Sequence, residues 1–386
     1  MRIDMHIHYM TPSWAEDREW LAREPYWEFL TRPDSGKSVQ GWATAERMIA
    51  DMDAAGIDKV VLQGEYFFAH ESAVRRNNQV IDLLARWPDR VLAFAAIQPK
   101  AGSAALDELK RCLDHGMRGV GESGAYAQGY TLDNPDFLRM AEKCIEYGIP
   151  LLLHANEEVG RFYRGKATTP LAHYYQLASR YPELKLVLAH WGGGLFFYEI
   201  MPEVRKTLRN VWYDTAASPL LYPTGTIFRI ALQCLDAHKV LYASDYPLLV
   251  YPRQQREPDF RPFLSEIELL GLDAQVLSNV MGGNAGRLLG LLPADEPIAG
   301  EATRPAKPQP LRDAAGGGIT DSLSVSWVAH AFPATREIFE RYHIPWQDSP
   351  LPFWEPIAQS ACARGLGPDE RRRLLAELNE ATRVRK

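Results

Sequence analysis

The stretch RIDMHIHYM, residues 2–10, carries two histidines, His6 and His8, on either side of one isoleucine. Its apolar run IDMHIH predicts a β-strand, and residues two apart in a strand face the same side. Both imidazoles therefore face one point. Two interpretations are open: polar residues on the wet face of an edge strand, or the first ligands of a metal site. A catalytic metal site needs about three protein ligands, so the rest of the chain must supply the others.

Seven further apolar runs alternate with amphipathic stretches typical of helices, several of which stop at Gly or just before Pro. The runs are mostly continuous, as in parallel strands that are covered on both faces. All eight runs are 3–8, 59–63, 91–97, 118–122, 149–154, 184–190, 210–214 and 239–245. Eight β/α units predict an α/β fold, the (β/α)8 TIM barrel. A doubly wound open sheet is the rival, and the lack of GxGxxG after the first strand counts against it.

The chain divides into three parts by composition. Residues 1–292 are predicted to form the barrel, and residues 319–386 a small C-terminal helical domain. Between them, residues 293–318 are rich in Pro, Ala and Gly and predict a linker. Within the barrel, residues 10–43 form a long insertion that is rich in aromatic residues, mostly Trp. It is interpreted either as a lid over the site or as a packed flap without ligand contact.

The overall composition is that of an ordinary globular protein, with 386 residues, 46% hydrophobic residues and a net charge of -6. This charge gives no reason to expect nucleic acid or a membrane as a partner. No signal peptide and no apolar run of about 20 residues is found, so a cytoplasmic location is expected. The scattered cysteines predict reduced core thiols; they are Cys112, Cys144, Cys234 and Cys362.

Ionisable side chains recur at the C-terminal ends of the predicted strands, which a TIM barrel gathers onto one face. Four of the ten histidines of the chain lie there. The residues are His6, His8, Glu122, His154, His190, Asp214 and Asp245. Their convergence predicts a divalent-metal site. Imidazole and carboxylate ligands suit Zn²⁺, which we expect, and also Mn²⁺ or Fe²⁺.

The motifs DMHIH, LLLHANE, LAHWGGG and YASDYP occur in this order and resemble the amidohydrolase superfamily. More narrowly, they resemble its amidohydrolase-related branch, which holds small-molecule hydrolases and decarboxylases of the aminocarboxymuconate-semialdehyde and resorcylate types. NAGRLLGL, which begins at residue 284, is similar to the closing motif of that branch. The resemblance covers about residues 1–292.

The resemblance implies a role for each matching residue. His6, His8, His154 and Asp245 would bind one divalent metal. His190 would stand beside the metal-bound water or the substrate, and Asp245 would also transfer the proton.

Other residues of the predicted mouth have two interpretations each. Glu122 either bridges two metals, the second held by His154 and His190 as in related two-metal barrels, or acts as an acid that faces the metal ligands or the substrate. Asp214 either supports a metal ligand or caps the next helix. The glycines at 192–194 either let backbone approach the substrate or form a tight turn.

A further group near the mouth is predicted to bind substrate: Tyr66, Asn156, Glu157, Arg161 and Lys166. The cationic loop that contains Arg161 and Lys166 suits a substrate carboxylate. The alternative is that these loop charges are merely solvated.

Residues 319–386 resemble a small helical domain of the DUF1858-like type. That type usually carries cysteines after its second helix, and HIPWQDSP, the matching stretch here, has none. A redox role is therefore not expected. Docking to a protein partner is favoured, with dimerisation or a lid as the alternatives.

The residues at the predicted mouth are compatible with three functions. We expect a metal-dependent hydrolase of a small amide, lactone or ester, in which a metal-activated water attacks at the C-terminal face of the barrel. The alternative is a metal-dependent nonoxidative decarboxylase of an aromatic or enol carboxylic acid. A third reading, an inert metal-binding scaffold, lacks support because no ligand position is missing. The expected partners are a small-molecule substrate, further copies of the chain in a homo-oligomer, and a protein partner at 319–386.

Overall fold

The protein is described by a computed structural model over residues 1–31, 38–160, 163, 166–293, 319–321, 323, 325, 328–329, 332–346 and 357–382. The chain groups into two compact units, Met1–Arg304 and Pro305–Lys386. Apart from Pro293, the predicted linker lies outside the described residues. The predicted domain bounds therefore stay a prediction.

Eight parallel strands form the centre of the first unit, one for each predicted run. They are β1 (Ile3–Ile7), β2 (Lys59–Leu62), β3 (Val91–Ala93), β4 (Val120–Ser123), β5 (Leu151–Leu153), β6 (Leu186–Leu188), β7 (Val211–Asp214) and β8 (Val240–Leu241). Strands β1 to β3 and β4 to β8 pair in sequence order. The two sheets join at both edges, through the bridges Ala95–Val120 and Ile7–Tyr246. The α/β TIM barrel is thus confirmed.

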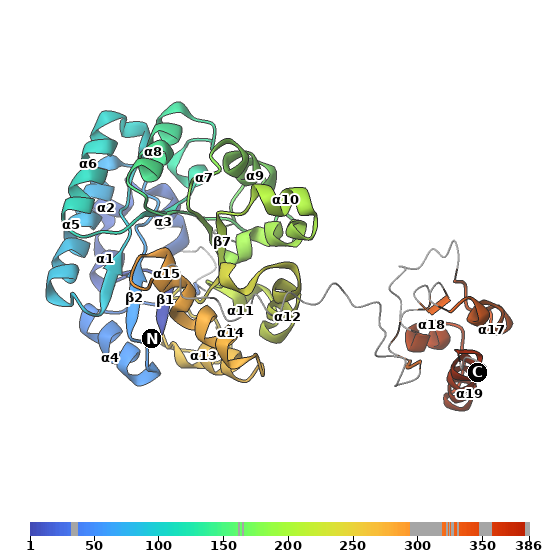
Figure 1. Ribbon diagram of the computed structural model, residues 1–386. Helices are drawn as coiled ribbons and strands as arrows, with labels where there is room; N and C mark the ends of the chain where they lie inside the picture. The colour runs from blue at the N-terminus through green and yellow to red at the C-terminus, as the bar shows by residue number, and fades with distance from the viewer. Residues whose placement is uncertain are drawn as a thin grey trace. The chain divides into compact units, whose positions relative to one another are not determined.

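Helices follow the strands and surround them (Figure 1). The larger ones are α4 (Ala45–Ala55), α5 (His70–Arg86), α6 (Ser103–Asp114), α8 (Pro135–Glu146), α9 (Leu171–Arg180), α10 (Pro202–Thr207), α12 (Thr224–Cys234) and α13 (Arg261–Glu268). The shorter α-helices and the 3₁₀ and π segments are η1 (Pro99–Ala101), α7 (Ala125–Gln128), η2 (His190–Ile200), α11 (Ser218–Leu221), η3 (Ala237–Lys239), α14 (Ala274–Ser278), η4 (Asn279–Gly283) and α15 (Asn284–Leu288). The sequence explains several ends: Thr44 caps α4 by accepting the N–H of Arg47, and Gly56 ends it in the left-handed region.

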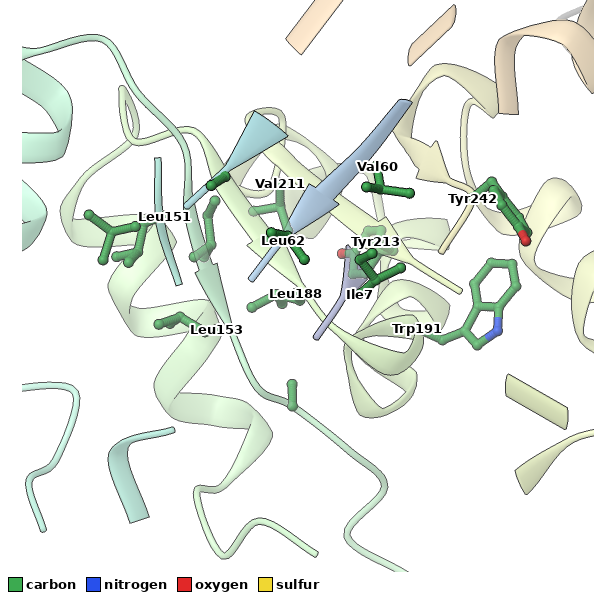
Figure 2. Packing of buried hydrophobic residues seen from close by; sticks show 14 of the residues in the cluster. Ile7, Val60, Leu62, Leu151, Leu153, Leu188, Trp191, Val211, Tyr213 and Tyr242 are labelled. Carbon is green, nitrogen blue, oxygen red and sulfur yellow. The ribbon is translucent and has the colours of Figure 1, made fainter. Parts of the chain in front are cut away.

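The side chains along each strand alternate between two apolar layers, which explains the continuous hydrophobic runs in the sequence. Val61 of β2 and Leu152 of β5 point into the barrel interior with Ile3 and Met5. The neighbours of Val61 and Leu152 pack outward against the helices. Figure 2 shows part of this outer cluster, including Ile7, Val60, Leu62, Leu151, Leu153 and Leu188. Helix α15, from the predicted closing motif, contacts β1 and β8.

The insertion after β1 contains α1 (Pro12–Glu16), α2 (Arg18–Leu21) and α3 (Pro25–Thr31). Three of its tryptophans are buried together with Tyr66 and Phe67; they are Trp14, Trp20 and Trp27. Trp20 Nε1 donates to Ser72 Oγ of α5 at 2.8 Å. The Glu24 carboxylate accepts the N–H groups of Phe68 and Ala69 at 2.6 and 3.0 Å, at the start of that helix. The insertion is therefore fastened to the beginning of α5.

The second unit contains η7 (Pro333–Thr335), α17 (Arg336–Arg341), α18 (Ile357–Ala363) and α19 (Pro368–Thr382). Its small core includes Phe339, Leu374 and Leu378. The Asn379 side chain of α19 pairs with the backbone of Ile319. The DUF1858-like identity of this unit and its docking role stay predictions.

Two expectations from composition concern the whole chain. Within the described ranges, the structure contains no helix that is long and apolar enough to cross a membrane. All four cysteines are free, and Cys112, Cys144 and Cys234 are buried as expected. Cys362 is exposed rather than part of a core, because it lies on the outer face of α18, whose Ile357 and Ala361 are buried.

Candidate active site

His6 and His8 meet at the mouth of the barrel, as the two-residue spacing predicts. Their Nε2 atoms are 3.2 Å apart, and both side chains are buried. Asp245 reaches the same point from the loop after β8, with Oδ1 3.5 Å from His8 Nε2. Its backbone N–H donates to the carbonyl of His6 at 2.9 Å, which holds that loop against β1. These three side chains each offer a ligand atom within 4.8 Å of the others.

Glu122, His154 and His190 form a second group of the same kind. Glu122 Oε1 lies 2.6 Å from His154 Nδ1 and 3.6 Å from His190 Nε2. The other carboxylate oxygen of Glu122 lies 3.6 Å from His6 Nε2 and 3.5 Å from His8 Nε2. Glu122 therefore stands between the two groups, and the structure brings these six of the seven predicted strand-end residues together.

Two of the imidazoles are oriented by hydrogen bonds at Nδ1, the ring nitrogen that points away from the cluster. His6 Nδ1 lies 2.8 Å from Asp214 Oδ2, and His190 Nδ1 lies 2.9 Å from the carbonyl oxygen of Ala216. Both partners are acceptors, so each Nδ1 carries a proton and donates. In the neutral ring, the lone pair is then on Nε2, which faces the cluster. Metal-binding histidines are held in the same way.

The charges of the cluster also suit a divalent cation. Burial alone would lower the pKa of His8, but hydrogen bonds to Glu122 and Glu65 and the charge of Asp245 raise it to about 9. Burial opposes ionisation of Glu122 too, yet His154 and His6 hold its pKa well below the usual range. The buried carboxylates thus draw positive charge to this point, and the converging ligands are all nitrogen and oxygen. The residues fit a divalent metal ion.

The loop after β6 is a left-handed turn that begins at His190. His190 and Trp191 have positive φ values of 55° and 59°, and the glycines at 192–194 continue the turn with φ between 57° and 94°. A Cβ at Gly193 would lie 2.3 Å from the carbonyl oxygen of Asn156. This geometry supports the tight-turn interpretation of the glycines. The turn fixes where the His190 side chain enters the site.

The predicted substrate-binding residues after β5 are largely bonded to one another. Asn156 Nδ2 donates to Tyr163 Oη at 2.6 Å, and Asn156 Oδ1 accepts the N–H of Ala167 at 2.7 Å. Lys166 Nζ lies 3.4 Å from Glu157 Oε1. Arg161 lies outside the described residues. Substrate binding by this group stays a prediction.

Tyrosines line the side of the site next to His154. The ring of Tyr66, a predicted substrate residue, has its centroid 5.5 Å from that of His154, and the ring of Tyr126 is at 5.7 Å. The ring of Tyr26, in the insertion, contacts the rings of both Tyr66 and Tyr126. Trp27 lies 6.4 Å from His8 between ring centroids. Tyr126 and Tyr26 are not among the predicted site residues, although the position of Tyr126 shortly after β4 is a signal for it.

A buried ion pair lies behind His8. Glu65 Oε1 is 3.6 Å from His8 Nδ1, and Arg76 Nε is 2.6 Å from Glu65 Oε2. The Arg76 guanidinium also covers the ring of Trp14 at 4.6 Å. No signal in the sequence indicated this pair, because Arg76 is simply one of several charged residues on α5.

The family model for amidohydrolases, Amidohydro_2, matches residues 3–291 of this chain. The chain belongs to this amidohydrolase family. A 2-amino-3-carboxymuconate-6-semialdehyde decarboxylase from Dictyostelium discoideum is 21% identical over 345 residues, or 76% of this chain and 92% of the relative. A gamma-resorcylate decarboxylase from Rhizobium radiobacter is 24% identical over 301 residues, or 64% of this chain and 88% of the relative.

Solved structures support the fold of this amidohydrolase. A 5-carboxyvanillate decarboxylase from Novosphingobium aromaticivorans, in complex with manganese, has a TM-score of 0.60 at 19% identity, covering 75% of this chain and 96% of the other. A dihydroxybenzoic acid decarboxylase from Polaromonas sp. JS666, also with bound manganese, has a TM-score of 0.55 at 19% identity, with 75% and 97% coverage.

These relatives correct the sequence analysis on one central point. The prediction of a hydrolase is wrong, because the relatives are decarboxylases, and they support the decarboxylase alternative instead. The hydrolase and decarboxylase motifs share their metal ligands, so the motifs could not separate the two reactions. The prediction of an enzyme in the amidohydrolase superfamily is confirmed.

Proposed function

We propose that this amidohydrolase-family enzyme is a divalent-metal-dependent, nonoxidative decarboxylase of an aromatic or enol carboxylic acid. One observation carries the proposal: six buried ligand residues, in two groups with Glu122 facing both, occupy the barrel mouth. The decarboxylase relatives support decarboxylation as the class of reaction.

The metal ligands are proposed to be His6, His8, His154 and Asp245. When bound, a divalent ion supplies positive charge that binds acidic oxygens of the substrate. Manganese in two related structures supports Mn²⁺, and Zn²⁺ is the ion predicted from the ligand types. Glu122 has the bridging role if metal analysis gives two ions per chain. With one ion, it acts as the hydrogen-bond partner of His154.

Residues of the chain itself are proposed to transfer the proton. In the proposed reaction, the bond between the carboxylate and its carbon breaks, CO2 leaves, and a proton takes its place on that carbon. Asp245 and His190 are proposed to carry this proton, because they face the cluster from opposite groups. The aromatic insertion, with Trp27 beside His8, would limit the entry of water.

The test uses the purified full chain, stripped with a chelator and reloaded with Mn²⁺ or Zn²⁺. Aromatic acids are assayed for CO2 release, and lactones, esters and amides for acid release. The proposal predicts CO2 release from at least one aromatic acid, lost on chelation and restored by metal. Acid release without CO2 release would refute it.

The remaining expectations are not tested by the structure or the relatives. Cytoplasmic location, homo-oligomer formation, a protein partner at 319–386 and the lack of nucleic-acid or membrane partners stay predictions.

A further inference from the structure

Three tyrosine hydroxyls meet beside the cluster of candidate metal ligands, and they come from three separate segments. Tyr26 lies on α3 of the insertion, Tyr66 follows β2, and Tyr126 lies on α7 after β4. Tyr126 Oη donates to Tyr26 Oη at 2.8 Å, and Tyr66 Oη donates to the same oxygen at 3.3 Å. Tyr26 is therefore the centre of the trio.

The two hydrogen bonds within the trio do not use the O–H group of Tyr26 as a donor. A phenol has one O–H and can accept through its oxygen. The Tyr26 oxygen accepts from both neighbours, so its own hydrogen needs a third partner. The part of the chain that the structure describes shows none. Burial raises the pKa of Tyr26 to about 12, so the donor is present at neutral pH.

This donor belongs to the tyrosine group that lies on the His154 side of the ligand cluster. Tyr66 and Tyr126 both pack against the ring of His154. Tyr26 packs at 5.8 Å against Trp27, which borders His8. Tyr26 is partly exposed, whereas Tyr66 is only 4% exposed. The backbone is also shaped for the trio, since a Cβ at Gly124 would lie 2.9 Å from the Tyr66 ring.

We infer that Tyr26, positioned by Tyr66 and Tyr126, is a specificity-determining residue that donates a hydrogen bond to a second oxygen substituent on the substrate ring. This inference rests on the proposed function. It selects acids that carry a further hydroxyl, over those with only the hydroxyl next to the carboxylate. A site built around a donor rejects a ligand that lacks the acceptor, because the donor is left unpaired once the bound ligand covers it.

The experiment measures dissociation constants by calorimetry for the Mn²⁺-loaded chain. The probes are 2-hydroxybenzoate and the 2,3-, 2,4-, 2,5- and 2,6-dihydroxybenzoates. For the wild type, at least one dihydroxybenzoate is expected to bind about tenfold more tightly than 2-hydroxybenzoate, the size of one good hydrogen bond. In Tyr26→Phe, that preference should fall to within about twofold, with the affinity for 2-hydroxybenzoate kept.

Two further variants complete the design. Tyr126→Phe removes a partner of Tyr26 and should weaken the same preference. Tyr181→Phe is the control, because Tyr181 Oη bonds to Glu142 at 2.7 Å on the outer surface, and it should leave the preference unchanged. Equal loss for all five acids in Tyr26→Phe, or no preference in the wild type, would overturn the inference. CO2 release by the wild type, measured separately, shows whether the proposed function itself fails.

Discussion

Asp214 Oδ2 accepts a hydrogen bond from His6 Nδ1 at 2.8 Å, and both side chains are fully buried. The other oxygen of Asp214 accepts the backbone N–H of His190 at 2.9 Å. One carboxylate at the end of β7 thus sets the ring of a proposed metal ligand and the start of the turn that carries His190. This supports the interpretation of Asp214 as the partner of a metal ligand.

We predict that Asp214→Asn weakens metal binding by about 10–100-fold. The asparagine amide would donate to His6 Nδ1, which moves the imidazole proton to Nε2, where the metal must bind. Metal affinity is measured by competition with a chelator. Asp273→Asn, at the start of α14 where Asn also caps a helix, is the matched control. Wild-type affinity in Asp214→Asn would contradict the role.

Substitutions of the two proposed proton carriers should differ in their effect on the metal content of the enzyme. Asp245→Asn removes a ligand, so both bound metal and kcat are expected to fall. His190→Asn is expected to keep the metal and lower kcat by about 10²-fold or more, the usual contribution of a positioned acid or base. Metal is measured by elemental analysis and kcat by CO2 release. A His190→Asn enzyme with wild-type kcat would remove His190 from the reaction.

Neighbouring arginines on α5 should differ strongly in their effect on stability. Arg76→Leu leaves the fully buried Glu65 carboxylate without its arginine partner, which should lower the free energy of unfolding by roughly 3–5 kcal/mol. Arg75 forms a partly exposed pair with Asp17 at 2.7 Å, so Arg75→Ala should cost about 1 kcal/mol or less. Urea unfolding, followed by tryptophan fluorescence, compares them. Equal losses of unfolding free energy in the two variants would show that the buried pair stabilises the fold no more than the exposed pair does.

Glu108 should make the barrel unit sensitive to acid. Burial alone would raise the pKa of Glu108, but hydrogen bonds from Arg111 and Asn77 outweigh it and hold the pKa below the ordinary value of 4.5. The folded state therefore prefers the charged form, and this stability is fully present above pH 4.5. It is lost as the pH falls through the lowered pKa.

The measurement is the difference in Tm between the wild type and Glu108→Gln. This difference should be largest near pH 7 and shrink below pH 4.5, since the other titrating groups contribute to both proteins. A difference that is constant with pH would show that the charge of Glu108 does not stabilise the fold.

The fold and the six clustered residues could be predicted because both follow from strand position. Continuous runs such as KVVL mark strands with two buried faces, and a barrel must bring His6, His154 and Asp245 to one mouth. The chemistry could not be predicted, because hydrolases and decarboxylases of this family share those ligands. Tyr26 and Arg76 were also missed as site residues. They reach the site through packing of the insertion and α5, and this packing has no fixed spacing in the sequence.

The central claim, metal-dependent decarboxylation at the His6–Asp245 cluster, is tested most directly by the fate of the proton. The Mn²⁺-loaded chain is incubated in D2O with each aromatic acid of the substrate screen, and the products are analysed by NMR. The account predicts equal amounts of CO2 and of a product with one deuterium at the carbon that carried the carboxylate, and no product from His8→Ala. Absence of CO2 from every acid of the screen, or unchanged turnover in His8→Ala, would contradict it.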